Sequence, residues 1–167
     1  MNAQHDKPAH GATGGWIGAP APDFVLPRDG AGVMKLADFR GRKLVLYFYP
    51  KDDTSGCTVE ARAFNALLPA FEKAGAAVVG VSPDAPKKHD AFKTKYDLAQ
   101  PLLSDESKTM LAAYGVWVEK SMYGRTYMGV ARTTFLIDER GIVRHVWEKV
   151  KTAGHAEAVL ARAQALA

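Results

Sequence analysis

The stretch that decides the fold runs Lys43-Leu44-Val45-Leu46-Tyr47-Phe48-Tyr49 and ends at Pro50. After its lysine this run is continuously apolar, which is typical of a central strand covered on both faces, as in a parallel sheet. A second buried strand is predicted at 77–81. Between the two strands lie a polar loop, 51–56, and a helical pattern that continues to Ala74. This order predicts two neighbouring strands joined by a helix.

The helical pattern between these strands places Phe64, Leu67, Leu68 and Phe71 on one face, and Gly75 is a natural stop after it. Pro69 lies inside the pattern. Because proline removes a backbone donor and clashes with the preceding turn, it should bend the helix one turn earlier, near 65–66.

The rest of the chain supplies further short elements. Strands are predicted at 23–26, 33–35, 102–103, 134–137 and 142–147, and helices at 86–96, at 107–114 and around 156–163. Strands that alternate with helices and then form a hairpin imply an α/β fold, with a mixed sheet and helices on both faces. We therefore expect a thioredoxin-like fold with an N-terminal extension.

Length and composition limit the classes of protein to consider. With 167 residues the chain suits one domain, predicted at 16–167 after a flexible leader at 1–15. The net charge of +4 is scattered, with no arm or zinc-ligand pattern suited to nucleic acid. No apolar run is long enough for a membrane span, and residues 1–15 lack the apolar core of a secretion signal. A cytoplasmic protein is predicted, and the single cysteine agrees.

Cys57 is the main candidate for chemistry. It follows the loop after the most apolar strand and opens the next helix, with Ser55 as the predicted N-cap and Gly56 allowing close backbone approach. Unpaired N–H groups and the helix dipole favour a thiolate there. The alternative is an inert cysteine that fills the core. On position alone the two readings are equally balanced.

The sequence around Cys57 resembles the active-site signature of peroxiredoxins, Pro50-x-x-x-Thr54-x-x-Cys57. The longer string Tyr47–Thr58 is similar to the bacterioferritin-comigratory protein class, also called peroxiredoxin Q. Further matching motifs occur in order at 103–106, 115–124 and 132–138, so the resemblance extends from Ile17 to the C-terminus.

The resemblance implies a thiol-dependent peroxidase that reduces hydrogen peroxide and organic hydroperoxides through a sulfenic acid on Cys57, with no cofactor and no metal. By the same resemblance, Thr54 would place its hydroxyl against the peroxide, and Arg132 would hold the thiolate and polarise the substrate. Pro50 would shield the pocket from water. Glu60 would either orient Arg132 or complement the helix dipole, and the second role is preferred. Each of these residues taken singly has a plainer interpretation as a cap, a solvated arginine or a strand terminator.

The chain departs from that class in lacking a second, resolving cysteine. One form of the class places it five residues after the first, where this chain has Arg62. Another places it in the following helix around 91–93, where this chain has Lys93. The sulfenic acid must then meet an external thiol: thioredoxin, glutaredoxin with glutathione, or a similar reductant. A chain whose cysteines had been replaced would look the same. Ser55 stands where the class commonly has proline, and a monomer is expected.

Two other classes stay open at this point. A cysteine hydrolase is disfavoured because no histidine follows in a recognisable partner context, and a binding module without turnover would share the fold. The histidines show no metal-ligand spacing and are interpreted as surface or strand residues. The aromatic residues Trp117, Tyr123 and Tyr127 are expected to pack rather than to line the pocket.

Overall fold

The computed structural model of the chain describes residues 13–166, with side chains from residue 15 onward. Helix α1 occupies Thr13–Trp16, so the described chain begins three residues before the predicted domain start, and most of the predicted leader at 1–15 lies outside the described residues. Within the described part, no helix combines the length and the apolar character that a membrane crossing requires.

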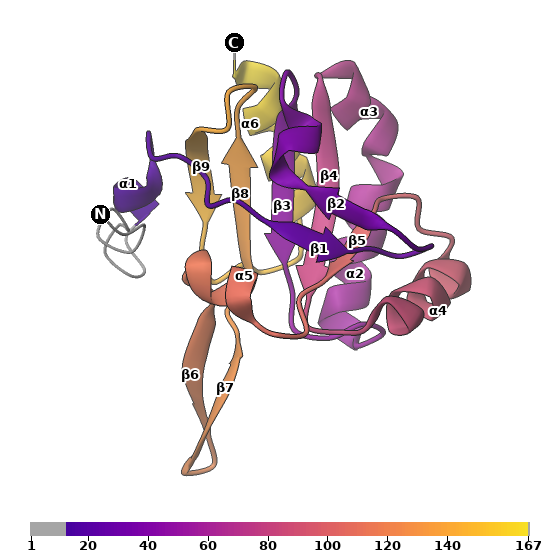
Figure 1. Cartoon of the computed structure of the whole chain (residues 1–167), viewed down its shortest axis with the longest axis vertical. Coiled ribbons are helices and arrows are strands. Elements are labelled where there is room, and N and C mark those ends of the chain that lie inside the picture. Colours follow the sequence, from indigo (N-terminus) through magenta and orange to yellow (C-terminus); the bar gives the residue numbers. More distant parts are fainter. Residues whose placement is uncertain (1–12, 167) are drawn as a thin grey trace.

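The central feature of the described chain is a five-stranded sheet in the order β5-β4-β3-β8-β9 (Figure 1). Its strands are β3 (Lys43–Phe48), β4 (Ala76–Ser82), β5 (Leu102–Ser104), β8 (Thr133–Ile137) and β9 (Val143–Trp147). Strands β3, β4 and β5 are parallel, whereas β8 runs antiparallel to both β3 and β9. The predicted mixed sheet is confirmed, and each predicted central strand lies within two residues of its observed bounds.

Strand β3 is the middle strand of the sheet, and both of its faces are covered. Leu44, Leu46 and Phe48 enter one hydrophobic cluster, while the intervening residues Val45 and Tyr47 enter a second cluster on the opposite face. All six residues of β3 are buried. The apolar run therefore contributes to two cores at once, as its composition predicts.

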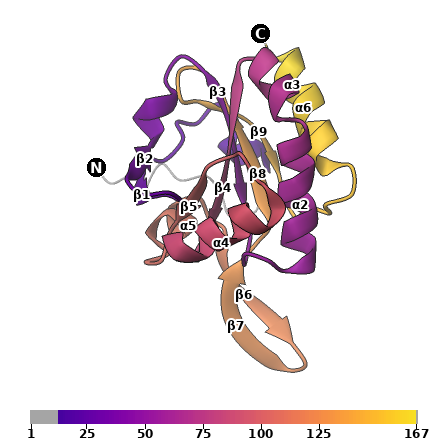
Figure 2. The same ribbon diagram turned by 90° about the vertical axis from the view of Figure 1, so that its right-hand side faces the viewer.

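Helices flank the sheet in the thioredoxin-like arrangement. Helices α2 (Ser55–Ala66), α3 (Leu68–Lys73) and α6 (His155–Ala165) lie together along one face in Figure 2. Helix α4 (Pro86–Tyr96) matches its predicted bounds and crosses between β4 and β5, and α5 (Thr109–Ala113) lies inside its predicted range. The break between α2 and α3 falls at Leu67, two residues before Pro69, so the predicted bend is confirmed.

The small front sheet differs slightly from prediction. Strands β1 (Val25–Pro27) and β2 (Val33–Lys35) pair antiparallel, with β1 beginning two residues later than expected, and a short 3-10 helix, η2, follows at Leu36–Phe39. Asp23 and Phe24, which were predicted to begin this strand, lie before β1. There the Asp23 carboxylate accepts a hydrogen bond from the Phe24 amide.

One element was not predicted. Strands β6 (Trp117–Met122) and β7 (Arg125–Val130) form a hairpin that projects from the body of the protein (Figures 1 and 2). Its turn is Tyr123-Gly124, and both residues have positive φ, as a two-residue hairpin turn requires. Trp117 packs against the core as expected, but the packing role expected for Tyr123 is wrong, since its side chain is 97% exposed.

Candidate active site

Cys57 lies at the start of α2, the helix that follows β3 in the chain. It is the third residue of that helix and is almost completely buried, with 1% of its surface exposed. Thr54, not Ser55, occupies the N-cap position, so the predicted cap is wrong by one residue. The reason is that the Thr54 carbonyl already accepts a helical hydrogen bond from the Thr58 amide, at 2.8 Å. The sulfur thus sits in the first turn, beside the unpaired amides of the helix start.

Arg132 reaches Cys57 from a distant part of the sequence. It directly precedes β8, which pairs antiparallel with β3 so that Phe48 lies opposite Thr133. This register brings the start of β8 beside the end of β3, and Nη2 of Arg132 lies 3.3 Å from Sγ of Cys57. The sheet therefore delivers a cation to the sulfur, at hydrogen-bond distance for a sulfur acceptor.

Gly56 provides the space for this guanidinium. A Cβ atom at position 56 would lie 3.3 Å from Nη2 of Arg132, which is tighter than an ordinary van der Waals contact. A side chain here would push the guanidinium away from Cys57. The close approach that the sequence predicted at Gly56 is thus made by the Arg132 side chain.

Glu60 fixes the other half of the same guanidinium. Its Oε1 lies 2.6 Å from Nη1 of Arg132, and the carboxylate is almost fully buried one turn after Cys57. The preferred interpretation of Glu60 as a complement to the helix dipole is wrong, because it is the sixth residue of α2 and lies beyond the first turn. The structure supports the alternative, in which Glu60 orients Arg132.

Burial and charge act against each other in this ion pair. Burial raises the pKa of Glu60 to about 7, although the charge and hydrogen bond of Arg132 act to lower it. Burial acts to lower the pKa of Arg132, but Glu60 and Cys57 outweigh it and raise that pKa above its usual value. The second carboxylate oxygen, Oε2, has no hydrogen-bond partner among the described residues.

Thr54 and Pro50 border the loop that leads to Cys57. The Thr54 hydroxyl donates its proton to the Lys51 carbonyl at 2.8 Å and is exposed, so its lone pairs remain available to an incoming donor. Pro50 is half-buried directly after Tyr49. Both residues therefore lie on the chain segment between the sheet and the sulfur, where the sequence signature places them.

A buried network that the sequence did not reveal lies beneath this loop. Asp52 accepts a hydrogen bond from the Tyr49 hydroxyl at 2.6 Å, and its other oxygen lies 2.6 Å from Nδ1 of His89. His89 and His155 are both buried, so their interpretation as surface or strand residues is wrong. For His89 the available signal was its position three residues before Phe92, on the apolar face of the predicted helix.

The same network contains the one cluster of possible metal-ligating groups among the described residues. Atoms of Asp52, Asp84 and His89 lie within 4.8 Å of one another. These atoms are occupied by hydrogen bonds from Tyr49, Ser82, the Asp52 amide and the imidazole itself. The 2.6 Å contact of the ring nitrogen with the carboxylate is a direct hydrogen bond, shorter than the spacing of two ligands that share an ion. We therefore describe the cluster as a hydrogen-bond network.

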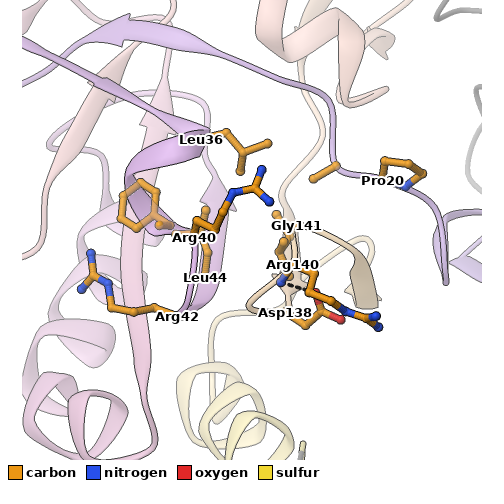
Figure 3. A pocket seen from close by; sticks show the side chains of 11 residues that line it. Pro20, Leu36, Arg40, Arg42, Leu44, Asp138, Arg140 and Gly141 are labelled. Carbon is orange, nitrogen blue, oxygen red and sulfur yellow. Dashed lines mark hydrogen bonds between the residues drawn. The ribbon is translucent and has the colours of Figure 1, made fainter.

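A separate cavity of about 160 Å³ lies at the other end of the sheet. It is bordered by Leu44 at the start of β3 and by Ile137 at the end of β8, the ends opposite to those near Cys57. Figure 3 shows Arg40 over this cavity, whereas the side chains of Arg42 and Arg140 extend away from it. This cavity is distinct from the cysteine site.

An arginine held on a buried cysteine by a buried carboxylate is the arrangement that the resemblance to thiol-dependent peroxidases with a thioredoxin-like fold leads us to expect. The comparison with protein families agrees: residues 17–146 match the AhpC/TSA family, and the chain belongs to it. Within that family it is a peroxiredoxin of the Bcp, or peroxiredoxin Q, class.

Individual relatives support this placement. The chain is 49% identical over 148 residues to peroxiredoxin Bcp of Xanthomonas campestris, covering 87% of this chain and 92% of that protein. It is 43% identical to peroxiredoxin Bcp of Escherichia coli, covering 84% and 90% of the two chains. The solved structure of Xanthomonas campestris peroxiredoxin Q superposes with a TM-score of 0.83 at 48% identity, covering 86% of this chain and 90% of that one.

Proposed function

We propose that the protein reduces hydrogen peroxide and organic hydroperoxides through a sulfenic acid on Cys57, which an external thiol then reduces. In the first step the Cys57 thiolate attacks the terminal peroxide oxygen and the O–O bond breaks. The sulfur gains that oxygen as a sulfenic acid, and the departing oxygen takes up a proton to leave as water or an alcohol. A solved structure of the Xanthomonas campestris bacterioferritin comigratory protein is described for alkyl peroxide reduction, which supports the organic substrates.

The observation that carries this proposal is the 3.3 Å contact between Nη2 of Arg132 and Sγ of Cys57. Negative charge moves from the sulfur to the departing oxygen during the attack. A guanidinium placed beside both atoms stabilises that charge where it develops, and this lowers the barrier more than ground-state binding would. Burial of the site strengthens the effect, since fewer water molecules compete for the charge.

Thr54 and Pro50 complete the proposed site. The Thr54 proton is already given to Lys51, so its oxygen acts as acceptor for the O–H of the incoming hydroperoxide and orients the terminal oxygen toward the sulfur. Pro50 covers the loop side of the site and presents no donor of its own to water.

The regenerating step uses a second molecule because the chain has one cysteine. A thiol from glutathione, glutaredoxin or thioredoxin attacks the sulfenic sulfur, water leaves, and a mixed disulfide forms. A further thiol then releases Cys57 and carries away the disulfide. We also propose, from the resemblance to its class, that the protein acts as a monomer.

Mass spectrometry of the intact protein tests the proposal. After one equivalent of peroxide we expect the added mass of one oxygen atom on Cys57, and in the presence of glutathione the mass of a mixed disulfide. A protein that keeps its original mass while peroxide persists in the solution would rule out the peroxidase function. An oxygen adduct that glutathione leaves unchanged would rule out glutathione as the reductant.

A further inference from the structure

The loop that leads to Cys57 is tied to helix α4 by one buried side-chain contact, from Asp52, and by exposed hydrogen bonds from Lys95 and Tyr96 to Asp53. Asp52 lies in this loop, two residues before Thr54, and its Oδ2 is 2.6 Å from Nδ1 of His89 on α4. His89 has no exposed surface, and Asp52 is 4% exposed. The backbone amide of Asp52 also donates to Asp84 at 2.8 Å, so the loop is held at this residue from two directions.

The contacts around His89 fix its hydrogen-bonding roles. Its Nε2 faces the carbonyl oxygen of Leu103 at 2.9 Å, which can only accept, so Nε2 carries a proton. Its Nδ1 faces the Asp52 carboxylate, whose other oxygen is occupied by the Tyr49 hydroxyl. A second proton must therefore lie between Nδ1 and Oδ2. The pair has one more proton than a neutral imidazole beside an ionised carboxylate.

The electrostatics agree with this geometry. Burial lowers the pKa of His89, but the hydrogen bond and charge of Asp52 outweigh it, and the pKa is raised above its ordinary value. Asp84, from the segment between β4 and α4, acts in the same direction. The contact is therefore held together as an ion pair inside the protein, where leaving either partner alone is costly.

We propose that Asp52 and His89 are positioning residues for peroxide reduction, which hold the 50–54 loop against α4 so that Thr54 stays in place beside Cys57. The inference rests on the proposed function. In this inference the pair acts by fixing the position of the loop. Neither residue contacts the Cys57 sulfur, and the opposite charges of the pair almost cancel. A displacement of the loop by a fraction of an ångström would misplace the Thr54 hydroxyl and slow the attack on peroxide.

Two substitutions of Asp52 distinguish the effect of its hydrogen bonds on the loop position from the effect of its charge. In D52N the amide oxygen still accepts from Tyr49, and the amide nitrogen donates to Nδ1 of a neutral His89, whose Nε2 proton still meets Leu103. Every hydrogen bond of the pair is kept and both charges are lost. In D52A both the Tyr49 hydroxyl and His89 lose their partner, and the loop loses its buried side-chain contact with α4, while the backbone hydrogen bond to Asp84 and the exposed contacts of Asp53 with α4 remain.

Lys93 provides a matched control on the same helix. Its Nζ lies 2.7 Å from Oδ2 of Asp29, so K93M removes an ion pair between α4 and the body of the protein without touching the loop. Two rates are measured for each variant by stopped flow and by mass: oxidation of Cys57 by hydrogen peroxide, and alkylation of Cys57 by iodoacetamide. Alkylation needs an accessible thiolate but has no O–O bond to orient.

We expect D52A to oxidise about 10- to 100-fold more slowly than the parent, with D52N and K93M within about threefold of it. Alkylation should stay within about twofold in all three variants. Equal oxidation rates for D52A and the parent would overturn the inference, and so would a parallel fall in alkylation, or a loss in D52N as large as in D52A. A parent protein that leaves peroxide intact would instead remove the proposed function itself.

Discussion

Glu60 and Arg132 form an ion pair of 2.6 Å between residues 72 positions apart in the chain, and the carboxylate side chain is only 1% exposed. Such a pair is expensive to bury, because both ions lose their hydration. The pair therefore adds little to the free energy of unfolding, and its main effect is to fix the position of the Arg132 guanidinium. One guanidinium nitrogen is bound to Glu60, and the other is left directed at Cys57.

Replacement of Cys57 by serine should abolish peroxide consumption, because the hydroxyl is not an effective nucleophile toward an O–O bond and the chain holds no other thiol. The fold should persist, since the two side chains have similar volume. Peroxide loss is followed by absorbance and folding by circular dichroism. Consumption at the parent rate by a folded C57S protein would refute the assignment.

Substitution R132A should lower the rate of Cys57 oxidation by about 10²- to 10³-fold, the usual effect of losing one charge-stabilising donor. The control R132K keeps the positive charge but cannot bind Glu60 and Cys57 with two separate nitrogens, so an intermediate rate is expected. Stopped-flow mixing with hydrogen peroxide measures both. Indistinguishable rates for R132A and the parent would contradict the role of the guanidinium.

Substitution E60Q should slow oxidation about tenfold at pH 8, where the Glu60 carboxylate is ionised and holds Arg132 in place. Burial raises the pKa of Glu60 to about 7, so the parent itself becomes protonated there below neutral pH. The gap between parent and variant should therefore narrow as the pH falls from 8 to 6. E72Q changes an exposed glutamate on α3 and serves as the control. A gap that widens on acidification would exclude this explanation.

Substitution T54V should reduce the rate of oxidation by about 10- to 100-fold, because it removes the acceptor proposed to orient the peroxide. T54S restores the hydroxyl and should recover most of the activity. The ratio of the two rates is the informative measurement, since both variants lack the native side chain. If valine and serine behaved alike, the hydroxyl would have no part in the reaction.

His155 should make the folded protein sensitive to mild acid. Burial, with a smaller contribution from Arg132, lowers the pKa of His155 to about 4, whereas an unfolded histidine titrates near 6.5. The unfolded state therefore binds the proton first, and stability falls as the pH drops from 6.5 toward 4, by up to about 3 kcal/mol. Urea unfolding across this range should show a weaker loss in H155Q, which does not titrate. Parallel pH profiles for the two proteins would disprove this contribution.

Most of the fold could be predicted because the central strands are buried, and buried strands are continuously apolar in sequence. The run at 43–49 is apolar on both faces, and Pro69 marks the break at Leu67. The β6–β7 hairpin could not be found this way, since Met122, Tyr127 and Met128 are exposed apolar residues that show no buried face. Its one local signal was the turn at Tyr123-Gly124.

The site was predictable in part for a similar reason. Cys57 and Thr54 lie close together in sequence, and the distant Arg132 was identified from its resemblance to the family motif. The roles of Glu60, Asp52 and His89 depend on partners 72 and 37 residues away. Nothing in the local sequence states which polar side chains will meet inside a folded protein.

Helix α4 carries Lys93 in the region where part of this class has its second thiol, and that lysine is bonded to Asp29. This chain therefore has no second thiol on α4 that could meet the sulfenic acid. With an ion-paired lysine at this position, we expect the conformation of α4 to stay the same throughout turnover. The amide hydrogen-exchange pattern should then be the same before and after oxidation. Reduction of the Cys57 sulfenic acid is then a bimolecular step, and its rate should rise in proportion to the concentration of the external thiol.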